Sequence, residues 1–381
     1  MSFFSQFFNK PEARALGVDI GSSSIKVVQV KKKNGQAVLE TYGELALGPY
    51  AGLTVGQAVV LPPEKIATAI SDLMGEKEVN ITTRDSGVSI PFSSSLMSLV
   101  EMPEVGEKEL ATMVPIEARK YIPVPISEVM LDWSVIPKSD ILEDGTADSP
   151  RSEGIREVEA AVTAPNHPKI DVLMVAIHKD TIARYQEIVT KAGLNTSFFE
   201  IEIFSTMRSV LDDSLRPVMI LDMGAASTKL YIVERGIIRA SHTINRGSQD
   251  ITANISKSLG IKPEEAEVLK RQVGVLGPDK NVTEITTLVL DHIFAEANAS
   301  LLAFERKHNK AVSKVILIGG GASLKGLPEL AKNNFKTEVE PGFPFGKLAT
   351  PAFLENILRE TGPEFAVAIG LALRKLSEEG V

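Results

Sequence analysis

The chain has 381 residues and no cysteine. It therefore forms no disulfide, no thiolate metal site and no cysteine nucleophile, and this composition fits a reducing compartment such as the cytosol. Long apolar runs are also missing, because no stretch approaches the roughly 18–20 residues that a membrane-spanning helix needs. The N-terminus does not have the profile of a signal peptide, since its apolar part is short and no basic region precedes it.

Signatures of several other protein classes are absent as well. The net charge is −8, which argues against nucleic acid as a partner. The five histidines show no His-Glu-x-x-His spacing, and no Gly-x-Ser-x-Gly elbow occurs. Residues 342–348 resemble a P-loop, but their spacer is too short and contains a proline. The remaining composition, 44% apolar and 24% charged, is that of a soluble globular protein, and its length indicates two to four subdomains.

One eight-residue pattern is present twice. Asp19–Lys26 reads DIGSSSIK, and Asp222–Lys229 reads DMGAASTK. Each copy follows an apolar run and leads into a second strand-like run, so each predicts a β-hairpin with a turn of small residues. Two such turns, one in each half of the chain, can face each other across a cleft, and that arrangement suits a nucleoside triphosphate.

The residue types in the two turns indicate phosphate binding. Small residues let the backbone approach a phosphate, successive N–H groups form an anion-binding nest, and hydroxyl groups add donors. We expect phosphate contacts from Gly21, Ser22, Ser23, Ser24 and Lys26 in the first turn and from Gly224, Ala225, Ser227 and Thr228 in the second. Asp19 and Asp222 would hold a hydrated Mg²⁺. Either aspartate alone would be read as a turn-forming carboxylate, but the matched pair favours the metal.

A third motif joins a strand to glycines. Residues 314–318 predict a buried strand that meets Gly319, Gly320 and Gly321, and a helix follows near Leu324 or Leu327. Such glycines let an adenine ring and its sugar lie on the backbone, with a helix N-terminus nearby. Alone, a strand-loop-helix turn often uses glycine for packing. After the paired hairpins it indicates an adenosine site.

Residues 92–188 differ in character from the rest and predict a small α+β insert. They combine a helix at 107–120, a strand at 130–136 with the only tryptophan, and an exposed, mobile polar loop at 138–157. Four phenylalanines in residues 1–10 share one helical face and form either a frayed end or a small foot on a membrane or partner. The remaining predicted helices are 62–75, 180–192, 248–259, 263–272, 282–307 and 362–376.

This order of motifs resembles the actin-like ATPase superfamily, and within it the PilM family of type IV pilus assembly proteins, relatives of the division protein FtsA. Three stretches carry the closer resemblance, namely Glu117–Trp133, Leu221–Thr228 and Gly362–Arg374. The resemblance implies an α/β, actin-like (ribonuclease H-like) fold of two lobes with an inserted SHS2-like 1C subdomain. It divides the chain into a tail at 1–12, subdomain 1A at 13–91 and 191–215, the 1C insert at 92–190, subdomain 2A at 216–250 and 313–361, subdomain 2B at 251–312, and a closing helix of 1A at 362–381.

The resemblance also implies ligands and further site residues. ATP with Mg²⁺ is the expected cofactor, and Glu267 and Lys270 would flank the ribose, although the same spacing also suits a solvated ion pair. The hydrolytic carboxylate or glutamine would fall at 198–204, with Glu200 as the water-orienting candidate. The protein would be at most a slow ATPase and would act mainly as a nucleotide-controlled scaffold.

The partners implied by the resemblance belong to the pilus machine. PilM-like proteins capture the N-terminal cytoplasmic peptide of the membrane protein PilN in a groove between subdomains 1A and 1C, and they communicate with the pilus motor ATPases. We therefore expect a cytoplasmic protein peripheral to the inner membrane through PilN, with self-association into rings or filaments as a further expectation. Residues 121–133 are a candidate part of the groove, although core packing is the favoured role of Ile126 and Trp133.

Two other functions fit the superfamily. An FtsA-like cytoskeletal polymer would end in a linker and an amphipathic membrane helix, whereas this sequence stops at Val381 soon after the expected closing helix. A sugar-kinase-type phosphotransferase needs a carboxylate base for the sugar hydroxyl, and we identify no convincing base in the insert. The adaptor is therefore the favoured function.

Overall fold

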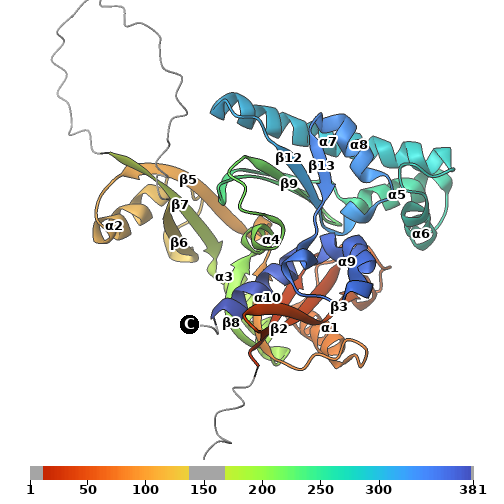
Figure 1. The fold of residues 1–381 in the computed structure, drawn as a ribbon, viewed down its shortest axis with the longest axis horizontal. Coiled ribbons are helices and arrows are strands. Elements are labelled where there is room, and N and C mark those ends of the chain that lie inside the picture. Colours follow the sequence, from red (N-terminus) through yellow and green to blue (C-terminus); the bar gives the residue numbers. More distant parts are fainter. Residues whose placement is uncertain (1–11, 137–167, 379–381) are drawn as a thin grey trace, which may run out of the picture. The chain divides into compact units, whose positions relative to one another are not determined.

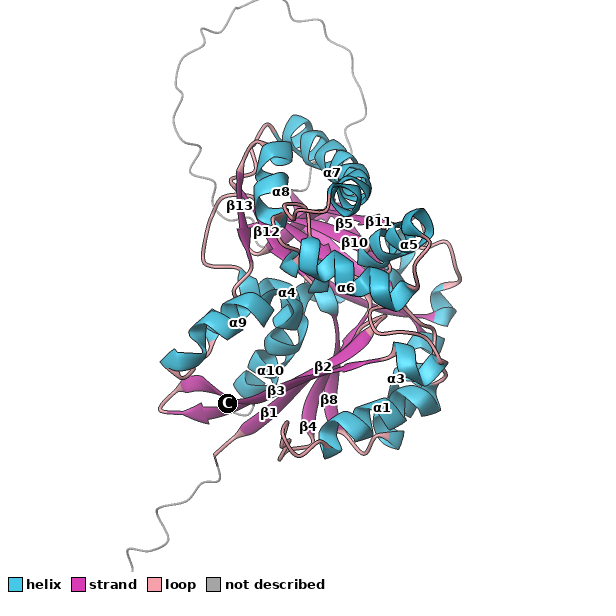
Figure 2. Ribbon diagram, turned by 90° about the vertical axis from the view of Figure 1, so that its right-hand side faces the viewer, coloured by secondary structure: helices cyan, strands magenta, loops and turns pink. Residues whose placement is uncertain are grey.

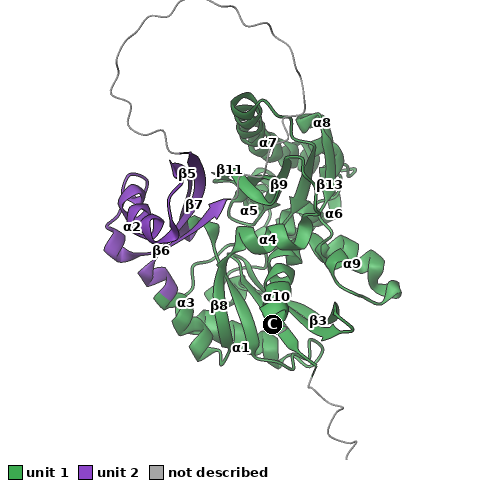
Figure 3. Ribbon diagram, turned by 60° about the vertical axis from the view of Figure 1, so that its left-hand side comes forward, with its two compact units in different colours: residues 1–93, 183–381 green, residues 94–182 purple. Residues whose placement is uncertain are grey.

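The computed structural model describes residues 12–136 and 168–378. The Phe-rich segment 1–10 and the predicted polar loop 138–157 lie outside this part of the chain. The chain forms two compact units, unit 1 from residues 1–93 and 183–381 and unit 2 from residues 94–182 (Figure 3). Each unit has a hydrophobic core of its own.

The first sheet of unit 1 places the N-terminal hairpin beside two parallel strands (Figure 1). Its strand order is β3-β2-β1-β4-β8. The strands are β1 (Arg14–Ile20), β2 (Ser24–Lys33), β3 (Gln36–Ala46), β4 (Asp85–Ile90) and β8 (Asn195–Ile201). Helices lie on both faces, with α1 (Pro63–Gly75) and α3 (Lys179–Lys191) on one and α4 (Glu202–Val210) and α10 (Ala366–Glu378) on the other (Figure 2). We call this sheet and its helices the first lobe.

Close packing of α10 explains two glycines of the first lobe. A Cβ atom at Gly17 of β1 would lie 1.9 Å from the carbonyl oxygen of Ala368 in α10. A Cβ at Gly370 of α10 would lie equally close, 1.9 Å, to the carbonyl oxygen of Ser205 in α4. The helix therefore lies directly on the strand and on its neighbouring helix, and no side chain larger than hydrogen fits at these contacts.

The second sheet of unit 1 has the order β11-β10-β9-β12-β13. Its strands are β9 (Val218–Met223), β10 (Thr228–Glu234), β11 (Ile237–Ile244), β12 (Lys314–Ile318) and β13 (Glu338–Pro341). A core that includes Leu221, Ile232 and Phe294 joins the sheet to its helices, α5 (Ser248–Leu259), α6 (Pro263–Val273), α7 (Lys280–His308) and α8 (Leu327–Phe335). We call this sheet and these helices the second lobe. The short helix α9 (Glu355–Thr361) precedes α10.

The two sheets of unit 1 share one plan. Each begins with three antiparallel strands in chain order and adds two parallel strands beside the first of them. The first strand of each sheet ends at one copy of the repeated pattern, so β1 and β9 are equivalent. The repeat in the sequence therefore corresponds to a duplicated architecture, as the actin-like expectation required.

Unit 2 is a three-stranded antiparallel sheet of order β5-β7-β6 with one helix. Its elements are β5 (Ser95–Pro103), α2 (Glu107–Ala118), β6 (Val129–Ile136) and β7 (Lys169–His178). Val114 of α2 is buried with Val100, Val172 and Met174, which lie on one face of the sheet, and Ile126 and Trp133 pack against this core. The opposite face carries other apolar side chains, among them Met97, Leu99, Met130 and Val175.

Most predicted elements are present with small shifts at their ends. Helix α5 and strand β12 have the predicted bounds, while α2 ends at Ala118 instead of residue 120. The predicted last helix begins as a 3₁₀ turn at Gly362–Phe365, and α10 continues it. None of the helices in the described part of the chain has the length and apolar character that crossing a bilayer requires.

Candidate functional site

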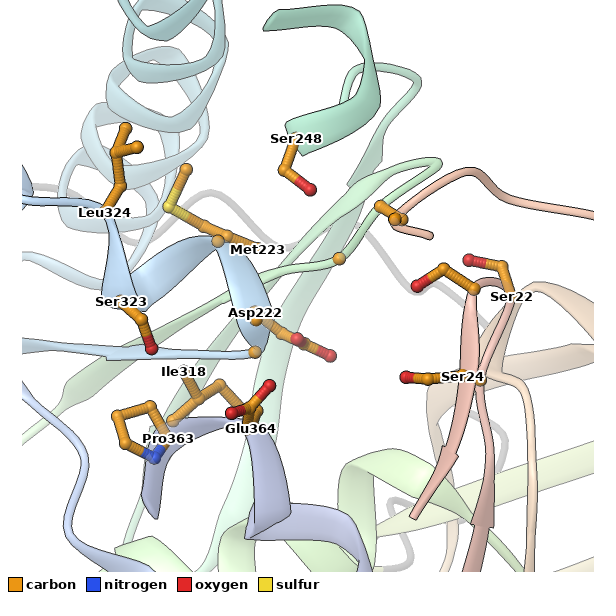
Figure 4. A pocket seen from close by; sticks show the side chains of 18 of the residues that line it. Ser22, Ser24, Asp222, Met223, Ser248, Ile318, Ser323, Leu324, Pro363 and Glu364 are labelled. Atoms are coloured by element: carbon orange, nitrogen blue, oxygen red, sulfur yellow. The ribbon is translucent and has the colours of Figure 1, made fainter. Parts of the chain in front are cut away.

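A cavity of about 360 Å³ lies in unit 1 where the turns of the two hairpins face each other (Figure 4). Figure 4 shows Ser22 and Ser24 on one side and Asp222 on the other. The residues that were predicted to bind a ligand and that line this cavity are Asp19, Gly21, Ser22, Ser23, Ser24, Lys26, Asp222, Gly224, Ala225, Glu267, Lys270, Gly319, Gly320 and Gly321. Ser227, Thr228 and Glu200 do not line it.

The first turn closes with a hydrogen bond from the Gly21 N–H to the Ser24 carbonyl, 3.0 Å long. In the β1–β2 register Asp19 lies opposite Lys26. The Lys26 ammonium lies 2.7 Å from the Ser24 hydroxyl and 3.0 Å from a carboxylate oxygen of Glu44. Burial raises the pKa of Asp19 to about 6, although Lys26 opposes this shift. The turn therefore presents backbone N–H groups, hydroxyls and one ammonium to the cavity.

The second turn has the same geometry. The Gly224 N–H donates to the Ser227 carbonyl at 3.1 Å, and Asp222 lies opposite Lys229. The N-terminus of α5 is attached to this turn, because the N–H of Ser248 donates to the Gly224 carbonyl at 2.9 Å. Thr228 is fully buried and its hydroxyl donates to the Arg246 carbonyl at 2.9 Å, which explains why it does not reach the cavity.

Three charged side chains meet at the base of the cavity. The Lys229 ammonium lies 2.7 Å from a Glu202 oxygen and 3.7 Å from an Asp222 oxygen. The second Glu202 oxygen accepts a hydrogen bond from the Phe92 N–H at 2.6 Å. Burial raises the pKa of Asp222. Burial alone would lower the pKa of Lys229, but Glu202 and Asp222 hold it above its usual value. The base of the cavity thus carries its own cation between carboxylates from both lobes.

Glu200 does not reach the cavity. Its carboxylate accepts hydrogen bonds from Arg208 at 2.7 and 2.8 Å and from Arg374 at 2.8 Å. Despite burial, which would raise it, the pKa of Glu200 is lowered because these guanidinium groups favour the charged form. Glu200 lies on β8, whereas Glu202 is the first residue of α4, so the change from strand to helix turns the two carboxylates in different directions. Glu202 is the residue of the predicted segment 198–204 that lines the cavity.

Glu267 and Lys270 form a buried pair and not a solvated one. Their charged groups lie 2.6 Å apart, and their side chains are 9% and 7% exposed. Glu267 also accepts hydrogen bonds from the Thr252 hydroxyl at 2.6 Å and from Arg271 at 2.8 Å. Burial lowers the pKa of Lys270, although Glu267 opposes the shift. Both side chains belong to the cavity lining, so α6 contributes a buried charged pair to the cavity.

The glycine loop packs directly on the second hairpin. Strand β12 is parallel to β9, with Ile318 opposite Asp222. Gly319 has a φ of +82°, and a Cβ there would lie 2.5 Å from an Asp222 carboxylate oxygen. A side chain at this position would displace the carboxylate, so the glycine keeps Asp222 in place. A 3₁₀ turn, Gly320–Ser323, follows, and the next helix starts only at Leu327.

The cavity also has lining residues that sequence reasoning missed. Besides Glu202, they include Glu44, Gly56, Ser248, Arg271 and Glu364. Burial and the neighbouring Glu44 raise the pKa of Glu364, whereas Lys26 and Arg271 oppose this. Arg271 directly follows Lys270, and Glu202 lies inside the segment expected to supply a carboxylate, so these two had a sequence signal. Glu364 lies in the stretch Gly362–Arg374 and Ser248 begins a predicted helix, but neither was recognised as a lining residue. Glu44 and Gly56 had no recognisable pattern.

The two aspartates fit a magnesium ion by their chemistry. Asp222 is buried and Asp19 is half-buried, both lie near the ends of equivalent strands, and carboxylate oxygen is the ligand type that Mg²⁺ takes. Within residues 12–136 and 168–378, no three histidine, aspartate or glutamate side chains form a group suited to a metal ion. A magnesium ion here would therefore draw its other ligands from water and phosphate.

The duplicated strand plan, with a turn from each sheet at one cavity, defines the fold of the actin-like ATPases. The chain matches the family model of the type IV pilus assembly protein PilM over residues 17–146 and 157–376. It belongs to that family.

Solved structures and curated relatives agree with this assignment. A structure of a PilM–PilN type IV pilus biogenesis complex has a TM-score of 0.77 and 26% identity, covering 96% of this chain and 99% of that chain. MreB5 of Spiroplasma citri, solved with AMPPNP, has a TM-score of 0.50 and 12% identity, covering 97% of this chain and 100% of that one, and shows the fold alone. The cell division protein FtsA of Streptococcus pneumoniae serotype 2 is 23% identical over 93% of this chain and 79% of its own length.

Proposed function

We propose that this protein is an ATP-binding scaffold of the type IV pilus assembly complex. It binds ATP with Mg²⁺ in the cavity of unit 1, and it binds the N-terminal cytoplasmic peptide of a PilN-type membrane protein elsewhere. The observation that carries the nucleotide part is the meeting of two equivalent turns, each preceded by an aspartate that lines the cavity, at one cavity. Family membership and the similarity to a PilM–PilN complex support the pilus part.

We assign each part of the nucleotide to a different part of the cavity lining. The N–H groups and hydroxyls of Ser22 and Ser24, with the small residues of the second turn, hold the phosphates. Asp19 and Asp222 hold the magnesium ion, which when bound neutralises phosphate charge. The buried Glu267–Lys270 pair faces the ribose, and residues 319–321 lie against the adenine.

The charge of the cavity favours a metal-bound nucleotide over a free one. Its lining has seven carboxylates and only five cationic side chains. A bare triphosphate would add negative charge to a site that is already acidic, whereas the magnesium complex adds less. We infer that Mg²⁺ is required for binding and is not only an aid to hydrolysis.

Glu202 replaces Glu200 as the proposed water-orienting residue. It lines the cavity, whereas Glu200 is held by two arginines away from it. Because Lys229 and the Phe92 N–H already occupy both carboxylate oxygens, Glu202 has few lone pairs left to hold an attacking water. Slow ATP turnover follows from this arrangement, and it suits a scaffold.

The proposed partner surface is on unit 2. Its helix α2 covers one face of the sheet, and the other face exposes Leu99 and Met130 to 36% and 57%. We propose that apolar side chains of the PilN-type peptide use this face and thereby keep the protein at the cytoplasmic side of the inner membrane. Communication with the motor ATPases and self-association into rings or filaments remain predictions.

Calorimetry with MgATP tests the nucleotide part. Asp222→Ala should weaken binding by about 100-fold or more, since it removes the buried carboxylate that we propose as a metal ligand. Asp213→Ala, in the exposed loop before β9, is the matched control and should bind as the wild type does. Unchanged affinity of the Asp222 variant would remove the proposed metal role.

A synthetic N-terminal peptide of the PilN-type protein tests the partner part. Met130→Asp should lower peptide affinity about tenfold or more, because it places a charge on the proposed apolar contact. Ile116→Asp changes an equally exposed apolar residue, 60%, on α2 and should have no effect. Both variants should keep wild-type MgATP binding, which shows that unit 1 is intact. Equal loss of peptide binding in both variants would reject the sheet face.

A further inference from the structure

The segment that joins β3 to α1 reaches the cavity with Gly56. We call its residues 52–60 the strap. The Val59 N–H donates a hydrogen bond to the carbonyl of Ser22 in the first turn at 2.9 Å. Just before the strap, the Leu47 N–H donates to the Ser23 carbonyl at 2.8 Å. The strap is therefore attached to the phosphate turn of the first lobe.

The same segment also touches the second lobe. The Ala58 N–H donates to the side-chain oxygen of Gln249, in the first turn of α5, at 3.1 Å. Gly56, with a φ of +88°, comes so close to α6 that a Cβ there would lie 3.0 Å from a Glu267 carboxylate oxygen. Both contacts join residues of different lobes, and Gly56 is itself part of the cavity lining.

These contacts form a path between the two phosphate turns. It runs from Ser22 to Val59 and Ala58, from there to Gln249, and from the Gln249 N–H to the Ala225 carbonyl at 3.1 Å. Figure 4 shows Ser22 and Ser248, the neighbour of Gln249, on opposite sides of the cavity. The strap thus connects the two phosphate turns. These are the same two turns that a bound triphosphate would connect.

The strap keeps its shape through bonds within the first lobe. Gly48 packs so tightly that a Cβ there would lie 2.0 Å from the Thr54 carbonyl, and the Thr54 N–H donates to the Gln57 side chain at 3.3 Å. Tyr50, just before it, bonds to Asp72 of α1 at 2.5 Å. By contrast, the hydrogen bond that joins the strap to Gln249 of the second lobe is a neutral one. A preformed element held to the second lobe by a neutral hydrogen bond and by close packing at Gly56 can release and re-form without unfolding.

We propose that the strap opens and closes over the nucleotide cavity and that its hydrogen bond to Gln249 holds it closed. We call the strap in this role the latch. The latch closes on a bound nucleotide by joining α5 to the first lobe, and it opens to let the nucleotide leave. Gln249 does not line the cavity, so its side chain controls the rate of exchange and not the contacts that hold the nucleotide. This inference rests on the proposed nucleotide function.

Dissociation of radiolabelled ADP, chased with excess unlabelled ADP in the presence of Mg²⁺, tests the latch. Gln249→Ala should release ADP about five to ten times faster than the wild type, the ratio expected for loss of one neutral hydrogen bond. Gln186→Ala, an exposed glutamine of α3, is the control and should release ADP at the wild-type rate. If the wild type binds no MgADP, the proposed function itself fails. If it binds and the Gln249 variant releases ADP at an unchanged rate, the latch is overturned.

A reversible cross-link gives a second measurement. Because the chain has no cysteine, Ala58→Cys together with Gln249→Cys introduces the only thiols. Joining them with a short cleavable bismaleimide in the presence of MgADP should trap the nucleotide, and cleavage of the linker should restore release. Either single-cysteine variant, treated in the same way, should exchange freely. Free exchange in the cross-linked double variant would also overturn the latch.

Discussion

Asp19 lies near the end of β1, where it is half-buried and lines the cavity. Burial raises the pKa of this group to about 6 from 3.8 in the unfolded chain. Between these two pH values the folded protein binds more protons than the unfolded one. For the metal-free protein, the contribution of Asp19 to stability is therefore greatest at the acidic end and is lost as the pH rises through about 6. A metal ion reverses this preference because it needs the ionised carboxylate.

The pKa of Asp19 predicts proton release on binding of MgATP. At pH 6 a large part of Asp19 is protonated in the free protein, and the proton must leave when the metal binds. Affinity should therefore fall as the pH is lowered below 6, and the heat of binding at pH 6 should vary with the ionisation enthalpy of the buffer. Asp19→Asn, if it retains measurable binding, should show less variation. The same heat in every buffer would contradict the raised pKa.

Glu200 and Glu202 are an example of a choice between residues that the sequence alone could not make. The resemblance placed a carboxylate within residues 198–204, and one of the two glutamates there lines the cavity. The choice between them depends on the residue at which β8 ends and α4 begins, and on Arg374, which comes from a distant part of the chain. Neither is visible in a local pattern. Ser227 and Thr228 do not line the cavity, and their phosphate contacts stay a prediction; the Thr228 hydroxyl donates to the Arg246 carbonyl instead.

Helices and strands with a clear apolar periodicity could be predicted from the sequence. Segments whose position depends on tertiary contacts could not. Helix α5 and strand β12 lie where apolar periodicity and flanking glycines placed them, and the two hairpins were visible from the repeat. The strap has no periodic pattern. Its position depends on single hydrogen bonds to Ser22 and Gln249, which only the folded chain brings together.

Helix α10 gives the prediction at the level of elements. Gly370→Ala places a Cβ at 1.9 Å from the Ser205 carbonyl, so α10 must move away from α4. Overpacking of this kind costs about 1–3 kcal/mol, and we expect a loss at the upper end because the obstacle is backbone. Urea unfolding measures the change. Gly75→Ala at the end of α1 is the control, since a Cβ there meets nothing within 4 Å. Equal stability of the two variants would show that α10 adjusts without cost.

At the scale of the molecule, the cavity is shared by two lobes that each have a sheet of the same plan. A ligand that contacts both turns adds free energy only when both lobes are folded and together. Ligand binding should therefore stabilise unit 1 as one body.

Thermal unfolding tests this coupling. At a MgATP concentration 100 times the dissociation constant, linkage supplies about 2.7 kcal/mol. For unit 1, residues 1–93 and 183–381, this raises the transition temperature by about 4 °C. EDTA in excess should abolish the rise, and so should Asp222→Ala. Two separate transitions for unit 1, only one of which moves with MgATP, would show that the lobes unfold independently.

The packing of α10 on β1 also has a consequence for synthesis on the ribosome. Strand β1 leaves the ribosome long before α10, yet Gly17 and Ala368 are in contact in the folded molecule. One face of the first-lobe sheet therefore lacks the cover of α10 until that helix has been synthesised. During that time its apolar strands are open to chaperones and to other nascent chains.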